Sequence, residues 1–281
     1  RYGFRPLACA APLLAVLGFI MFALTPQLFP ENIYLGLLLS TVIFAGSGGI
    51  LEITVSPILN SIPSGEKASA MSLLHSFYAW GQVAVVIVTS LFLFLLGNGS
   101  WQIPAAFWAA FPLAAAVIFM LCPLTDPVPE KSRIKARTLL SKPFFIVLML
   151  LILSGAATEL CISQWSSSFA QKALGMNKLA GDIFGMSFFA FMLGVGRLIH
   201  GIFGKRLNLT RIMAVCAFAG AVCYAVVALS PGSAPALIAC GLAGLASSLL
   251  WPGTLAIAGE KYPLAGASMF AILACAGDVG G

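Results

Sequence analysis

Ionisable side chains inside long apolar runs are the groups in this sequence that could do chemistry. Glu52 lies in "GGILEITVS", Glu159 in "GAATELCISQW" and Arg197 in "GVGRLIHG", while Asp278 lies in the last apolar run. A carboxyl group removed from water favours its neutral form, so it can bind and release a proton near neutral pH. A charge at the centre of a bilayer costs about 2.5–3.5 kcal/mol on insertion scales, so each group needs a partner, a cavity or a proton.

The runs that hold these groups have the length and composition of membrane-spanning helices. Of the 281 residues, 60% are hydrophobic and 9% are charged, against about 25% charged residues in soluble domains. Nine runs are each long enough to cross about 30 Å of hydrocarbon. They lie at roughly 6–26, 33–60, 69–96, 101–122, 143–170, 180–204, 210–230, 234–258 and 264–281. The short alternating strands of an outer-membrane barrel look different, so the sequence predicts an all-α polytopic membrane protein.

The basic residues between the runs predict an orientation. If successive runs alternate in direction, twelve Lys and Arg residues fall on the side of Arg1 and two on the other side. The twelve are Arg1, Arg5, Lys67, Lys131, Arg133, Lys135, Arg137, Lys142, Lys205, Arg206, Arg211 and Lys261, and the two are Lys172 and Lys178. Cytoplasmic loops carry the excess of basic residues, so the Arg1 side is predicted to be cytoplasmic. The net charge of +6 is then a sign of topology, and no nucleic-acid partner is expected.

No cofactor and no metal are expected. The seven cysteines contain no CxxC pair, and the two histidines are far apart in the sequence. We therefore interpret the cysteines as small buried hydrophobic residues. The sequence contains no phosphate loop and no nucleophile elbow, which argues against an ATP-driven pump and a membrane hydrolase. The expected partners are the lipid bilayer, a small solute, and protons or sodium, and the chain is expected to act as a monomer.

A polar stretch at 123–142 separates four upstream runs from five downstream ones, as a linker between two helical bundles does. An internal repeat supports this division, because the glycines and proline of "GSGGILEITVSP" recur in "GLAGLASSLLWP" at an offset of 195 residues. Ser247 stands at the position of Glu52 in the second copy. By the same offset the first half begins about fifty residues before Arg1. We therefore expect a fragment that lacks two upstream helices and the C-terminal end.

These features resemble the major facilitator superfamily, which has two parallel repeats of six helices. "RYGFR" at residues 1–5 is similar to the family's D-R-x-G-R-R loop, with Phe4 in place of an arginine. "GSGGILEITVSP" is similar to the G-x-G-x-L-E-T-x-x-N-P motif of the fucose:proton symporter branch. Here Ser56 replaces the Asn, and Ile53 intervenes before the Thr. "GVGRLIHG" also resembles the branch's helix-eight G-R-x-x-G, with one additional residue.

The resemblance implies a major facilitator fold of two six-helix bundles. Residues 1–123 are then the remainder of the N-terminal bundle (family helices 3–6), 124–142 a cytoplasmic linker, and 143–281 a truncated C-terminal bundle (helices 7–11). The implied function is that of a secondary active transporter and not of an enzyme. It would take up a sugar or similar small polar solute with protons, by alternating access, in the cell inner membrane. A drug or metabolite exporter or exchanger of the same fold, and a non-transporting membrane sensor, stay open as alternatives.

Glu52, Glu159 and Asp278 are the candidate proton-coupling residues. In the symporter branch the helix-four glutamate takes part in proton coupling and sugar binding, which implies this role for Glu52. The structural alternative is a glutamate that joins two helices by pairing with an arginine. Glu159 departs from the branch, so it is a second proton site, a determinant of specificity for an amino or cationic solute, or a structural residue. Asp278 has Gln82 as its repeat mate, and it contacts solute or proton, or packs between the bundles.

Polar and aromatic residues near these carboxylates are the candidate solute-binding residues. His75, Tyr78 and Gln82 have spacings of three and four, which place them on one helical face. "CISQW" adds Gln164 and Trp165. Ordinary helix packing and interfacial aromatic belts are the alternative for each of these residues.

Arg197 lies about eight residues from the end of its run, within snorkelling reach of the membrane surface. We interpret it as a gate residue that forms a salt bridge or snorkels, with direct solute contact as the alternative. Asp182 and His200 lie nearer the ends of the same run.

Overall fold

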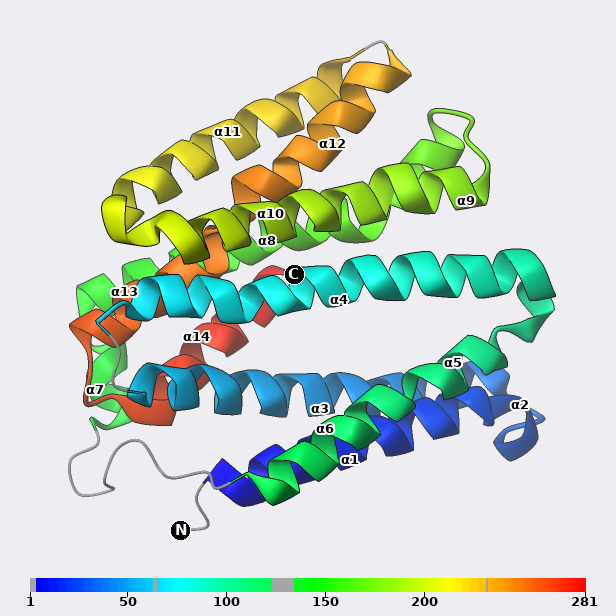
Figure 1. Ribbon diagram of the computed structural model, residues 1–281, viewed down its shortest axis with the longest axis horizontal. Coiled ribbons are helices and arrows are strands. Elements are labelled where there is room, and N and C mark those ends of the chain that lie inside the picture. Colours follow the sequence, from blue (N-terminus) through cyan, green and yellow to red (C-terminus); the bar gives the residue numbers. More distant parts are fainter. Residues whose placement is uncertain (1–3, 63–64, 123–133, 231) are drawn as a thin grey trace. The chain divides into compact units, whose positions relative to one another are not determined.

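The computed structural model describes residues 4–62, 65–122, 134–230 and 232–281, and within these ranges the chain forms helices and no strands (Figure 1). Eight helices of this part are long and apolar enough to cross a membrane. They are Arg5–Ala23, Ile33–Ser61, Lys67–Leu96, Asn98–Leu121, Pro143–Lys172, Lys178–Arg206, Leu209–Leu229 and Ser233–Lys261. The ninth predicted run contains a shorter apolar helix, α14 (Gly266–Gly280), of 15 residues. The predicted all-α polytopic fold is confirmed.

The helices divide into two compact units. Unit 1 contains Arg1–Ile62 and Leu91–Ser132, and unit 2 contains Pro63–Ser90 and Arg133–Gly281. Most of α4 (Lys67–Leu96) therefore belongs to unit 2 by its contacts. The division into bundles at 1–123 and 143–281 stays a prediction, and residues 124–133 of the predicted linker lie outside the described ranges.

Unit 1 is held together by close helix packing. Its helices are α1 (Phe4–Ala23), α2 (Thr25–Leu28), α3 (Ile33–Ser61), α5 (Gln102–Trp108) and α6 (Ala110–Leu121). Gly18 permits the close approach of α1 and α3, because a Cβ at this position would lie 2.8 Å from the Phe44 nitrogen. The Ser47 hydroxyl crosses the same contact and donates to the Ala11 carbonyl at 2.6 Å. Such small residues let membrane helices approach each other closely.

Unit 2 contains the remaining helices around a small hydrophobic centre. Besides α4 they are α7 (Ala136–Leu140), α8 (Pro143–Lys172), α9 (Lys178–Gly181), α10 (Phe188–Phe203), α11 (Leu209–Leu229), α12 (Ser233–Ser247), α13 (Leu250–Lys261) and α14. α12 packs on both α10 and α11, and α14 packs on α8. Ile162, Phe189, Leu193 and Ala243 are buried together where α8, α10 and α12 meet.

Two of the spans in unit 2 are irregular where the sequence predicts one continuous helix. The run 234–258 is divided at Ser248 and Leu249 into α12 and α13. The run 180–204 starts in α9 and passes through a π-helix, η3 (Asp182–Ser187), into α10. Irregular backbone of this kind is frequent at functional sites, because it frees main-chain groups for other partners.

Candidate functional site

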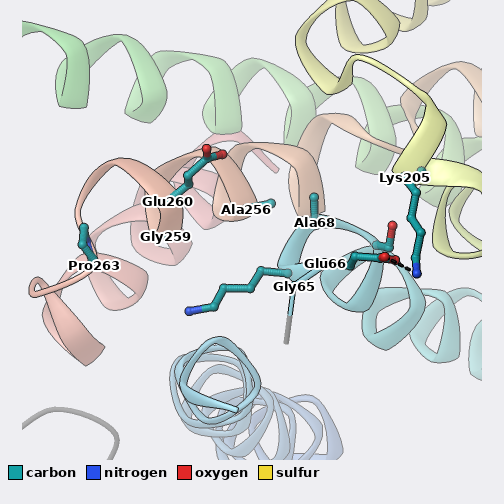
Figure 2. A pocket seen from close by; sticks show the side chains of 11 residues that line it. Gly65, Glu66, Ala68, Lys205, Ala256, Gly259, Glu260 and Pro263 are labelled. Atoms are coloured by element: carbon teal, nitrogen blue, oxygen red, sulfur yellow. Dashed lines mark ion pairs between the residues drawn. The ribbon is translucent and has the colours of Figure 1, made fainter. Parts of the chain in front are cut away.

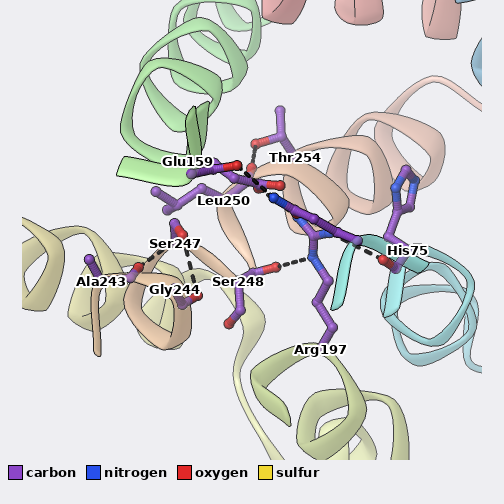
Figure 3. A network of polar contacts seen from close by, with 11 residues as sticks. His75, Glu159, Arg197, Ala243, Gly244, Ser247, Ser248, Leu250 and Thr254 are labelled. Atoms are coloured by element: carbon purple, nitrogen blue, oxygen red, sulfur yellow. Dashed lines mark hydrogen bonds and ion pairs between the residues drawn. The ribbon is translucent and has the colours of Figure 1, made fainter. Parts of the chain in front are cut away.

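Arg197 of α10 lies at the centre of a buried polar cluster that joins four helical segments (Figure 3). The residue is 1% exposed. Its Nη2 forms an ion pair with Glu159 Oε2 of α8 at 2.6 Å. Its Nη1 donates to the main-chain oxygen of His75 on α4 at 3.1 Å, and its Nε donates to that of Ser248 at 3.0 Å. The guanidinium carbon also lies 5.8 Å from the centre of the Tyr78 ring. We call these five residues the Arg197 cluster.

A proline explains why the Ser248 carbonyl is available to Arg197. In an α-helix this carbonyl would accept a hydrogen bond from the residue four positions later. That residue is Pro252, which has no N–H to donate. Arg197 supplies the missing donor at the break between α12 and α13. The guanidinium therefore links Glu159 of α8 to the Ser248 main-chain oxygen, which would otherwise lack a hydrogen-bond donor.

A stripe of polar side chains continues from Glu159 along one face of α8. Ser163 and Ser166 follow Glu159 at spacings of four and three, and all three residues are buried. The Ser163 hydroxyl accepts a hydrogen bond from Gln82 Nε2 of α4 at 2.8 Å. Gln82 Oε1 and the Ser166 hydroxyl are buried without a hydrogen-bond partner among the described residues. This stripe therefore keeps unused hydrogen-bonding capacity inside a membrane protein, where such groups are costly unless a ligand or water satisfies them.

A second buried carboxylate, Asp182, connects the far ends of α4 and α8. Ser90 of α4 donates to Asp182 Oδ2 at 2.7 Å, and Ser167 of α8 donates to Oδ1. Lys178 forms an ion pair with Oδ2 at 2.9 Å. A Cβ at Gly185 would lie 2.8 Å from the main-chain oxygen of Ser166, so the backbones of η3 and α8 are in direct contact here. We call Ser90, Ser167, Lys178 and Asp182 the Asp182 cluster.

We expect Asp182→Ala to lower the free energy of unfolding by about 2 kcal/mol, because two buried hydroxyls lose a charged acceptor. Lys178→Ala is the matched control, and it should cost less than about 1 kcal/mol because its side chain is 53% exposed. Thermal unfolding in detergent measures both variants. Equal losses in the two variants would contradict the description of Asp182 as a buried connection between helices.

Two Gly-Glu-Lys sequences, at residues 65–67 and 259–261, contribute to the wall of one cavity at the other end of α4 (Figure 2). This cavity of about 620 Å³ is bordered by Gly65, Glu66, Lys67 and, from the second copy, Gly259 and Glu260. Lys205 also lines it and forms an ion pair with Glu66. The cavity therefore has side chains of both charges at its wall, at the end of α4 that the basic residues predict to be cytoplasmic.

The structure brings several of the predicted site residues together. Glu159, Arg197, His75 and Tyr78 meet in the Arg197 cluster, and Gln82 lies beside it through Ser163. His75 contributes its main-chain oxygen to this cluster. The buried Arg197 side chain points to Glu159 and not to the membrane surface.

The other predicted residues lie elsewhere. Gln164 and Trp165 are on the exposed face of α8, with Trp165 67% exposed. Glu52 is half-buried in α3 and belongs to unit 1. Asp278 is exposed on α14. Of the loop motif at residues 1–5, Arg1 and Gly3 lie outside the described residues, while Arg5 donates to the Met120 carbonyl at 2.9 Å.

Sequence reasoning did not find the serines of the site. Ser163, Ser248 and the serines of the Asp182 cluster look like ordinary small residues of membrane helices. Ser72 is a further example, because its hydroxyl is hydrogen-bonded to His200 Nδ1 at 2.8 Å. One signal was present for Ser248, since a proline four positions after a residue predicts an unpaired carbonyl.

Comparison with known proteins identifies the fold. The sequence profile of the Major Facilitator Superfamily matches residues 1–281. The chain belongs to this superfamily of transporters. It is therefore a multi-pass membrane transporter and not an enzyme, as the sequence predicts.

Two solved structures of this superfamily resemble the chain closely in fold. One is the crystal structure of a variant of the E. coli fucose:proton symporter FucP, and the other is FucP in the outward conformation. Both have a TM-score of 0.75 and 16% sequence identity over 98% of this chain. The match covers 75% of the first and 74% of the second. No sequence among the curated proteins matches the chain. The resemblance to FucP-like transporters predicted from the motifs is confirmed at the level of the fold.

Proposed function

We propose that this transporter couples the entry of protons to the uptake of a sugar or similar small polar solute by alternating access. The observation that carries the proposal is the buried ion pair of Glu159 and Arg197 within the membrane-spanning helices. Intramembrane ionisable residues mark solute and proton pathways in transporters. The fold of the fucose:proton symporter supports the same class of function.

The proposed arrangement follows the superfamily. Two bundles, formed around 1–123 and 143–281 and joined by the 124–142 linker, alternate around a site near the middle of the membrane. The basic residues favour a cytoplasmic location of the linker and of the Arg1 side, in the cell membrane. With a neutral solute, a proton that crosses with the membrane potential supplies about 2.3 kcal/mol per 100 mV, enough for roughly fifty-fold accumulation of that solute.

We assign the coupling proton to Glu159. Its carboxylate contacts the guanidinium that holds α4 and the break between α12 and α13. Protonation of Glu159 removes the ion pair, which is one of the four contacts of the Arg197 guanidinium. It therefore changes the interactions between helices that must move. Glu52 is the second candidate, carried over from the resemblance of its motif, and Asp278 is the third. Gln82 is the proposed solute contact with the strongest support, because it has a buried acceptor without a partner among the described residues.

Measurements on the full-length protein in proteoliposomes test this function. We expect solute-dependent proton entry in the absence of sodium. Glu159→Gln should lose accumulation driven by a proton gradient while it keeps solute exchange, because a neutral side chain no longer carries the proton.

Glu52→Gln is the parallel variant for that experiment. Loss of coupling in Glu52→Gln with normal coupling in Glu159→Gln would move the proton site to α3. No solute-dependent proton entry with any sugar or sugar acid, or a strict need for sodium, would contradict proton-coupled uptake itself.

A further inference from the structure

The charge of Arg197 has one counter-charge among the described residues, the Glu159 carboxylate. The other contacts of the guanidinium are neutral, because they are the main-chain oxygens of His75 and Ser248 and the Tyr78 ring. The pair carries no net charge when Glu159 is ionised.

The titratable side chains on the helices packed around Glu159 leave this charge balance unchanged. They are Lys67, His75 and Tyr78 of α4, Arg197 and His200 of α10, Arg211, Cys216, Cys223 and Tyr224 of α11, Cys240 of α12, Glu260 and Lys261 of α13, and Cys275 and Asp278 of α14. Among the described residues, Arg197 is the one member of this set that forms an ion pair with Glu159. The Tyr224 hydroxyl donates to the main-chain oxygen of Thr158. Asp278 is exposed and forms no ion pair with any described residue. Arg197 therefore depends on Glu159 for its neutralisation.

Proton transfer to Glu159 leaves the Arg197 charge without a counter-charge, and a neutral sugar cannot supply one. The neutral carboxyl no longer balances Arg197, and an unpaired buried charge is strongly unfavourable in an occluded site. A carboxylate on the solute restores the balance. We infer that the solute is a hydroxylated carboxylate, such as a sugar acid, whose carboxylate binds Arg197 Nη2 while Glu159 holds the co-transported proton. This inference rests on the proposed proton-coupled uptake.

The exchange is balanced in atoms and charge. The contact between Arg197 Nη2 and Glu159 Oε2 breaks, a proton from water binds the Glu159 carboxylate, and the solute carboxylate accepts a hydrogen bond from Nη2. The site has no net charge before and after the exchange. The site therefore changes from one side of the membrane to the other without net charge, both when it is empty and when it is loaded. The transport cycle is electroneutral.

The guanidinium is prepared for this exchange by its two main-chain contacts. Nε and Nη1 are held by the oxygens of Ser248 and His75, which belong to different helical segments. These contacts do not depend on Glu159, so they keep the planar guanidinium in place when the ion pair opens. An arginine fixed in this way is well suited to bind a carboxylate.

The polar stripe on α8 fits the rest of such a solute. Gln82 Oε1 and the Ser166 hydroxyl are buried without partners among the described residues. Gln82 is hydrogen-bonded to Ser163, one helical turn from Glu159. Gln82 Oε1 can only accept a hydrogen bond, so it requires a donor such as a sugar hydroxyl. Carboxylate recognition at Arg197 and hydroxyl recognition at the stripe therefore lie about one helical turn apart along α8.

A comparison of D-glucuronate with D-glucose tests the inference, because these sugars differ by the carboxylate. In proteoliposomes of the full-length protein we expect glucuronate to drive proton entry without a change in membrane potential, and glucose to drive none. Glucuronate should also raise the melting temperature of the detergent-solubilised protein, and glucose should not, since a ligand stabilises the state that it binds.

The double variant Glu159→Gln with Arg197→Gln separates binding from folding. It removes both charges together, so it should stay folded, and its glucuronate affinity should fall by about 100-fold. Arg206→Gln is the matched control, because it removes an exposed arginine of the same span, and it should bind glucuronate normally.

The outcomes separate this inference from the proposed function. Proton entry driven by glucose together with a change in potential would overturn the inference and leave proton-coupled uptake intact. Normal glucuronate affinity in the double variant would also overturn it. No solute-dependent proton entry with these two compounds or with any other sugar or sugar acid would contradict the proposed function itself.

Discussion

Replacing Arg197 by leucine is expected to lower the free energy of unfolding by about 3–5 kcal/mol, because Glu159 is then a buried carboxylate without its counter-charge. The substitution also removes the donor to the Ser248 carbonyl, which Pro252 leaves unpaired. This effect should exceed that of any exposed charge in the protein. Thermal unfolding of the purified protein in detergent measures it.

The double variant Glu159→Leu with Arg197→Leu is the decisive comparison. Removal of both charges leaves no unpaired ion, and replacement of a buried pair by apolar residues is often neutral for stability. We therefore expect the double variant to be more stable than Arg197→Leu alone, although it should not transport. If both variants were equally destabilised, the loss would come from packing and main-chain contacts, and the charge pair would contribute little.

The fold of this protein could be predicted from the sequence, because hydrocarbon permits few structures. Main-chain groups inside a membrane must be satisfied within a helix or a closed barrel, so long apolar runs leave little choice. The irregular places were harder to predict. The break at Ser248 and Leu249 lies inside a run that is apolar throughout. Hydropathy therefore does not predict it, because hydropathy carries no information on which main-chain carbonyls lack a hydrogen-bond donor.

The candidate site could be predicted in part. Glu159 and Arg197 were identified because charges are rare in apolar runs, but their pairing could not be known from residues 38 positions apart. Gln164 and Trp165 show the limit of a polar pattern on its own, because the helix turns them to its exposed face. Serines gave no signal, since their frequency in membrane helices hides the few that bind a partner.

The repeat also shows that a shared residue need not have a shared environment. Gly244 of the second copy is packed closely against the main chain of α10. Gly49, its mate in the first copy, would have open space around an added Cβ among the described residues. The same glycine pattern therefore corresponds to a close helix contact at Gly244, but to no such contact with the described residues at Gly49.

This close contact leads to the second large effect, Gly244→Ala. A Cβ at Gly244 would overlap the Phe189 carbonyl oxygen, and it would lie 3.0 Å from the Phe189 carbonyl carbon and 3.2 Å from the Leu193 nitrogen. These atoms belong to the backbone of α10, so they cannot rotate away as a side chain could. We expect a loss of about 3 kcal/mol, at the upper end of overpacking, together with separation of α10 from α12.

Gly220→Ala is the matched control, and its effect should have the opposite sign. Gly220 is also in a helix of unit 2, α11, but a Cβ there would meet its nearest atom, Thr158 Cγ2, at an ordinary 3.7 Å. Alanine in place of glycine inside a helix then stabilises by about 0.5–1 kcal/mol, because the unfolded chain loses freedom. Melting temperatures of the two variants in detergent test the pair. A stable Gly244→Ala protein would contradict the packing of α12 on α10, and with it the position of the break whose carbonyl binds Arg197.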